Sequence, residues 1–103
     1  MDLCKKIYNL VDGFPVEERY GLRSQITRAA VSIPSNIAEG SARSSDKEFK
    51  RYLEIAIGSA FELETQLILS LEVEFVKPEQ FESVIDDLHK VQAGLNSLIS
   101  KLR

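Results

Sequence analysis

The sequence contains no tryptophan, one cysteine and one histidine. A single cysteine excludes an internal disulfide and any metal site built from several cysteines, so Cys4 is expected to be a small buried side chain. Ser, Cys and His show no triad-like arrangement, and the chain lacks a glycine-rich phosphate loop. The sequence therefore predicts no catalytic residue, no cofactor and a protein that is not an enzyme.

Long hydrophobic runs are also missing. No apolar stretch is long enough to span a bilayer, and the N-terminus lacks the pattern of a signal peptide. A cytoplasmic location is therefore expected. The chain has 103 residues, of which 44% are hydrophobic. That size suits one compact domain over residues 1–103, which association into oligomers would help to stabilise.

Apolar residues recur at three- and four-residue intervals along the chain, and no segment shows the alternation of a β-strand. Four helices are predicted, over residues 3–11, from 16 or 18 to 39, over 46–75 and from 78 onwards. Glycine and proline at 13–15, a turn at 40–45 and Pro78 separate them. Short connections favour antiparallel neighbours, so the expected fold is an all-α, up-down-up-down four-helix bundle.

The second predicted helix carries Pro34 well inside its apolar stripe. An interior proline removes one backbone hydrogen bond and crowds the carbonyl four residues earlier, at a cost of about 3 kcal/mol, so the helix is expected to kink there. Ser32 and Asn36 are expected to satisfy backbone groups near the kink. Glu39 and Gly40 are expected to form the last turn and a glycine stop.

The third predicted helix is apolar over more than one face. One stripe has the spacing of a bundle core. A second set of apolar residues widens this surface beyond what a small monomer would bury, which indicates a second buried interface. The predicted interface residues in this set are Ile57, Phe61 and Ile68.

Charge is unevenly distributed along the chain. Basic residues outnumber acidic ones by four within residues 19–51, whereas acidic residues outnumber basic ones by eight within 54–87. A basic cluster at the start of the third helix would attract a phosphate backbone without reading its sequence. Nearby carboxylates could instead pair with these cations in a solvated, salt-bridged face. The predicted nucleic-acid-binding residues are Arg43, Lys47, Lys50 and Arg51.

Two further sets of charged residues have a structural and a functional interpretation. Arg23 or Arg28 could form an ion pair with Glu39 across the kink, or with a neighbouring subunit. Asp86 and His89 have the carboxylate-x-x-histidine spacing of di-metal helical bundles, but such a site needs a second histidine motif. No metal site is therefore predicted.

Three blocks of the sequence resemble a known family: AAVSIPSNIAEG at residues 29–40, RSSDKEF at 43–49 and ELETQL at 62–67. Together they resemble the 23S ribosomal RNA intervening-sequence proteins over nearly the whole chain. The resemblance implies a four-helix bundle that assembles into a homopentameric barrel, with no catalytic residue. It also implies kinship with the accessory variability determinant proteins of diversity-generating retroelements, which bind nucleic acid and a reverse transcriptase.

Two hypotheses for function follow. The first is a non-enzymatic homo-oligomer, pentameric by resemblance, that serves as an adaptor for RNA or for a nucleic-acid-processing protein. The alternative is a protein-interaction or structural ring without a nucleic-acid role, whose acidic segment faces a basic partner. Whether the basic cluster is free of carboxylates or neutralised by them distinguishes the two.

Overall fold

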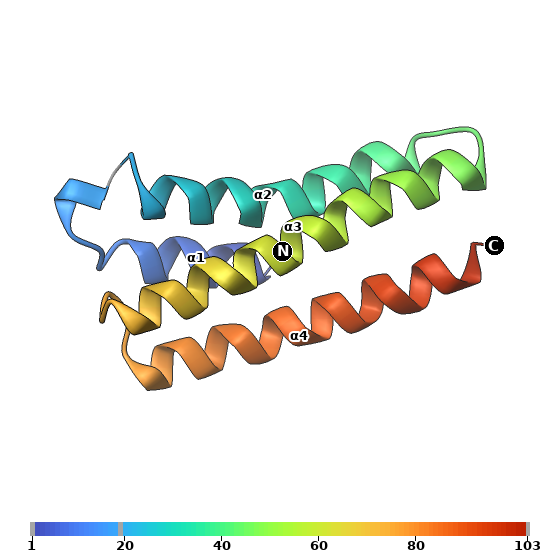
Figure 1. Ribbon diagram of the computed structural model, residues 1–103. Coiled ribbons are helices and arrows are strands. Elements are labelled where there is room, and N and C mark those ends of the chain that lie inside the picture. The colour runs from blue at the N-terminus through green and yellow to red at the C-terminus, as the bar shows by residue number, and fades with distance from the viewer. Residues whose placement is uncertain (1, 19, 103) are drawn as a thin grey trace.

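The computed structural model describes residues 2–18 and 20–102 and shows four helices (Figure 1). These are α1 (Asp2–Val11), α2 (Leu22–Ser41), α3 (Asp46–Glu72) and α4 (Pro78–Lys101), with a short 3-10 turn, η1 (Val16–Glu18), between the first two. No strand occurs in the described residues. The predicted all-α four-helix fold is confirmed.

Consecutive helices run antiparallel, and the molecule measures 43 × 24 × 19 Å. α3 packs against α2 and α4, and α1 packs against the same two helices, whereas α1 and α3 do not meet in the described residues. α1 therefore lies diagonally opposite α3. This order gives the bundle two opposite sides, which we name the α1/α2 flank and the α3/α4 flank.

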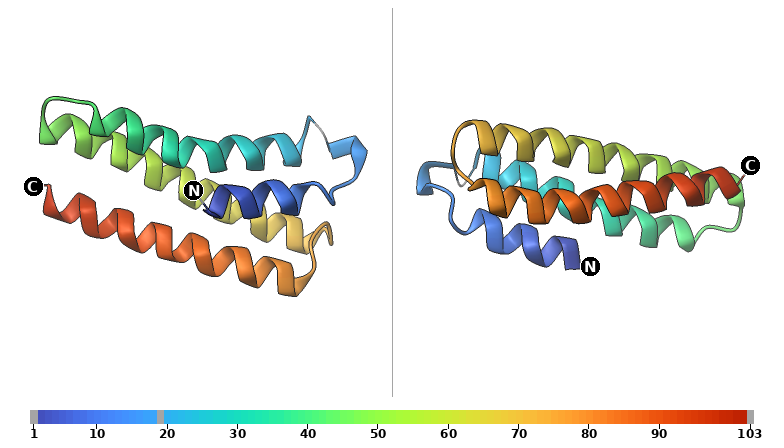
Figure 2. Two further views of the ribbon diagram at one scale, coloured as in Figure 1. Left: turned by 180° about the vertical axis from the view of Figure 1, so that it is seen from behind. Right: turned by 90° about the horizontal axis from the view of Figure 1, so that it is seen from below.

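The first helix is much shorter than the others. Its N-terminal end lies near the middle of the bundle, whereas the C-terminus lies at the end that holds the α2–α3 connection (Figure 2). α1 therefore covers only the half of the bundle that holds the α3–α4 connection. None of the helices in the described part of the chain is long and apolar enough to cross a membrane.

The core forms where the apolar stripes of the helices meet. Five of the largest side chains in it are fully buried: Ile7, Ile26, Ile33, Leu63 and Leu88. The predicted core stripe of α3 is buried through its centre, with Phe49 and Leu71 half-buried at its ends. Burial of such side chains contributes roughly 1.5–3 kcal/mol each, which is the main source of stability for a bundle.

Local capping fixes where α3 and α4 begin. The hydroxyl of Ser45 accepts a hydrogen bond from the backbone N–H of Glu48 over 3.2 Å, as the sequence predicts. Pro78 occupies the first turn of α4, where its missing N–H costs nothing. The side chain of Gln80 accepts from the backbone N–H of Lys77 over 2.9 Å.

Two predicted helix limits are wrong. Residues 16–18 form a 3-10 turn, and α2 begins only at Leu22. α3 ends at Glu72 rather than at Phe75, because Glu74 adopts a positive φ of 63° that no α-helix contains. This reversal turns the ring of Phe75 onto Phe14, with 5.4 Å between the ring centroids.

Candidate nucleic-acid and assembly surfaces

Pro34 lies inside α2, which continues through it from Leu22 to Ser41. Proline has no N–H, so the carbonyl of Ala30 loses its helical donor. The thiol of Cys4 on α1 donates to this carbonyl oxygen over 3.4 Å. The half-buried thiol also has a raised pKa, because burial disfavours the thiolate. Cys4 therefore remains a neutral donor, a role that the sequence did not reveal.

Asn36 satisfies a backbone group near the proline as the sequence predicts, whereas the hydroxyl of Ser32 bonds to side chains instead. The amide of Asn36 donates to the backbone carbonyl of Ser32 over 2.8 Å and to its hydroxyl over 3.0 Å. That hydroxyl lies 2.8 Å from the hydroxyl of Ser59 on α3. The motif around Pro34 therefore serves to join α2 to α3.

Gly40 does not end α2, contrary to the prediction. The helix continues to Ser41, and no glycine in the described residues has a positive φ. A Cβ atom at Gly40 would lie 2.6 Å from the Cβ of Tyr52 and 3.0 Å from a ring carbon of Phe49. The glycine is thus required by the close approach of α2 to α3 rather than by a turn.

Glu39 pairs with Arg43, one turn further along the chain. Arg43 also donates to the hydroxyl of Tyr52 over 2.9 Å, and its guanidinium lies 5.0 Å from the centre of that ring. These contacts tie the α2–α3 turn to α3. They also neutralise Arg43, so the predicted basic cluster is reduced to three cations.

Lys47, Lys50 and Arg51 line one hollow of about 600 Å³ at the start of α3. None of the three makes an ion pair among the described residues. The hollow also includes Glu48 and Glu54, so the surface is mixed in charge. The structure therefore brings three of the four predicted residues together, with carboxylates beside them.

The predicted interface residues lie on the outward face of α3. The side chains of Phe61 and Ile68 are 51% and 41% exposed, and Ile57 is half-buried. Phe61 and Ile68 lie three residues before and four residues after Glu64, whose carboxylate contacts α4. Because residues at these spacings share a helix face, both belong to the α3/α4 flank.

The carboxylate of Glu64 joins α3 to two residues of α4. This carboxylate accepts a hydrogen bond from the amide of Gln92 over 2.8 Å and lies 3.2 Å from His89 Nε2. These two contacts hold the pKa of Glu64 below its usual value. His89 is thus engaged with a carboxylate, and the described residues contain no group of three or more side chains placed to hold a metal ion.

Neither arginine ahead of the proline pairs with Glu39. Arg23 forms its ion pair with Asp12 over 3.0 Å. Arg28 donates only to the hydroxyl of Ser24, over 3.3 Å, and makes no ion pair in the described residues. Within one chain the predicted bridge to Glu39 is therefore wrong, because Glu39 pairs with Arg43 and Arg23 pairs with Asp12. An ion pair with a neighbouring subunit stays a prediction.

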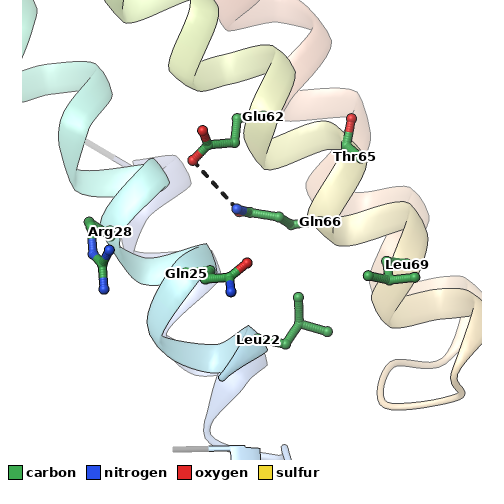
Figure 3. A pocket seen from close by; sticks show the side chains of 7 residues that line it. All are labelled: Leu22, Gln25, Arg28, Glu62, Thr65, Gln66 and Leu69. Carbon is green, nitrogen blue, oxygen red and sulfur yellow. Dashed lines mark hydrogen bonds between the residues drawn. The ribbon is translucent and has the colours of Figure 1, made fainter. Parts of the chain in front are cut away.

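Sequence reasoning also missed a hollow of about 610 Å³ between α2 and α3 (Figure 3). Gln66 lies against it with a side-chain oxygen that is buried and has no hydrogen-bond partner, while its nitrogen donates to Glu62 over 3.4 Å. No periodicity in the sequence marks a hollow, because it depends on the side chains of two helices. The lining residues are Leu22, Gln25, Arg28, Glu62, Thr65, Gln66 and Leu69.

The fold and these surfaces define a class: a small antiparallel helical bundle with an exposed apolar flank and a mixed-charge end. The chain belongs to the family described as 23S rRNA-intervening sequence protein, whose sequence model matches residues 1–97. The structure is similar to a crystal structure from Bacteroides thetaiotaomicron VPI-5482, described as a protein with unknown function from the S23 ribosomal protein family. The TM-score is 0.85 at 30% identity, and the match covers 95% of this chain and 92% of the other. No curated protein matches the chain.

Proposed function

We propose that this protein is a non-enzymatic cytoplasmic adaptor that assembles into a homo-oligomer, a pentamer by family resemblance, and binds structured RNA through the start of α3. The observation that carries the proposal is the set formed by Lys47, Lys50 and Arg51, cations without an ion-pair partner among the described residues. The family description supports RNA as the ligand, because it refers to 23S rRNA.

Assembly supports binding because it repeats the cations. Lys50 lies eleven residues before Phe61, so three helical turns separate two residues of one face of α3. An oligomer that buries Phe61 and Ile68 between subunits with parallel bundle axes would place the cations of neighbouring subunits at the same end of the assembly. Several weak phosphate contacts then act together, which raises the overall affinity above that of one subunit.

The test compares RNA binding of the unchanged protein with that of a variant in which Lys47→Glu and Arg51→Glu are combined. Affinity should fall as salt rises, with a log–log slope of about −2 to −3 for each engaged subunit, because each phosphate contact releases a counterion. The variant should lose most of the binding. A control with Lys77→Glu and Lys90→Glu has the same net charge and should keep it.

The presence of Glu48 and Glu54 in the same hollow supports the alternative, a protein-interaction scaffold without a nucleic-acid role. In that case the unchanged protein would not bind RNA or duplex DNA even at low salt. Equal losses in the variant and in its charge-matched control would also contradict a specific role for the start of α3. The assembly is tested separately by the solution mass of Phe61→Glu, which should be that of a monomer.

A further inference from the structure

Two surfaces on opposite sides of the bundle carry exposed apolar side chains. On the α3/α4 flank these are Phe61 and Ile68. On the α1/α2 flank, Tyr8 and Val31 are 50% and 40% exposed and line a hollow of about 470 Å³ together with Ser24, Thr27, Arg28 and Ser32. One flank thus projects apolar side chains, and the other contains a hollow with an apolar wall.

The two surfaces lie at the same position along the long axis of the bundle, which we call the same height. The hydroxyls of Ser32 and Ser59 are 2.8 Å apart, so Val31 is nearly level with Phe61. Leu22 and Leu69 line one hollow, so Ser24 is nearly level with Ile68. The hollow on the α1/α2 flank therefore spans the same heights as the apolar projection on the α3/α4 flank.

Opposite charges also lie at matching heights. The Arg28 guanidinium reaches the hydroxyl of Ser24, which is level with the stretch of α3 just before Ile68. On α4, Asp86 precedes His89 by about one turn, and His89 is level with Glu64. Asp86 is exposed and, like Arg28, has no ion-pair partner among the described residues.

From these relationships we infer that the α3/α4 flank of one protomer docks into the α1/α2 flank of a second copy, with parallel bundle axes. Phe61 enters the hollow beside Tyr8 and Val31, and Arg28 pairs with Asp86 of the neighbouring copy. The inference rests on the homo-oligomer in the proposed function and adds its contact surfaces. It is independent of whether RNA binds.

A contact between two different flanks is heterologous rather than two-fold symmetric. The complementarity of the two flanks favours this kind of contact. A two-fold contact between two α3/α4 flanks would bury Phe61 but leave Tyr8, Val31 and Arg28 exposed. The head-to-tail contact covers both apolar surfaces and pairs both charges. A docked pair then retains one unused flank of each kind, so the contact can repeat from copy to copy. The repeated contact gives a ring where the rotation between neighbouring copies closes, and an open chain where it does not.

A charge exchange tests the contact by solution mass across a dilution series. Arg28→Asp and Asp86→Arg should each weaken assembly at least about tenfold, because each places like charges against each other. The double variant should recover to within about threefold of the unchanged protein. Lys101→Asp, which changes the net charge as Arg28→Asp does but lies at the end of α4, should leave assembly unchanged.

Crosslinking then tests which flanks meet, in a Cys4→Ser background. Ser24→Cys and Asp86→Cys together should give a ladder of covalent oligomers with a short bis-maleimide, and each substitution alone should give none. Covalent dimers from either single variant, or an assembled double variant without a ladder, would overturn the inference and leave the proposed function standing. A protein that is monomeric by mass would overturn both, whereas loss of RNA binding alone would affect only the proposed function.

Discussion

Cys4 donates its thiol hydrogen to the carbonyl oxygen of Ala30, the acceptor that Pro34 leaves without its helical donor. The contact connects α1 to the interior of α2 across 26 positions of sequence. It also compensates in part for a proline that costs about 3 kcal/mol inside a helix. The free-energy contributions of Cys4 and Pro34 should therefore depend on one another.

A double-mutant cycle measures this dependence. Cys4→Ala should destabilise the fold by about 1 kcal/mol beyond its packing loss, because a buried carbonyl loses its donor. In a Pro34→Ala background that extra cost should vanish, since the new N–H at position 34 reaches the carbonyl of Ala30. Urea unfolding of the four proteins gives the coupling energy. An equal cost of Cys4→Ala in both backgrounds would contradict the relationship.

Gly40→Ala should destabilise the protein by about 1–3 kcal/mol, although alanine is the better helix former. The added Cβ would meet the Cβ of Tyr52 at 2.6 Å, and backbone-anchored atoms cannot rotate away. Gly94→Ala is the matched control, because a Cβ there meets nothing within 4 Å, and it should stabilise α4 by about 0.5–1 kcal/mol. Thermal unfolding distinguishes the two, and a raised melting temperature for Gly40→Ala would disprove the close-approach argument.

Glu64→Gln should reduce stability at pH 7 by less than about 1 kcal/mol, because the carboxylate is partly exposed. The pKa of Glu64 is held below its usual 4.5 by Gln92 and His89. The ionised group therefore contributes stability that is full above pH 4.5 and lost as the pH falls through the lowered pKa. The difference between the two proteins should disappear in acid. Glu82→Gln, at an exposed position, should show no such pH dependence.

Gln66→Met should stabilise the fold by about 1 kcal/mol, since it removes a buried acceptor without a partner and keeps a long side chain. Gln25→Met alters an exposed residue of the same hollow and should change stability little. Chemical unfolding of both variants provides the measurement. Destabilisation by Gln66→Met would mean that the hollow holds a water molecule bonded to the Gln66 oxygen.

The periodicity of apolar residues was sufficient to predict four helices and the buried stripe of α3, because burial of one helix face is a local and repetitive requirement. The caps at Ser45 and Pro78 were equally visible, since capping involves residues three or four positions apart. Asn36 was predicted to support the region around Pro34 for the same reason. These features depend on neighbours in sequence.

Only the tertiary structure decided the roles of Gly40, Cys4 and Arg43. Each depends on a partner in another helix: Tyr52 of α3 for Gly40 and Arg43, and Ala30 of α2 for Cys4. Sequence spacing cannot rank such partners, because helix packing sets the distances between them. The matching heights of the two flanks are decided in the same way, by the antiparallel register of α2, α3 and α4, which is a property of the folded bundle rather than of any one helix.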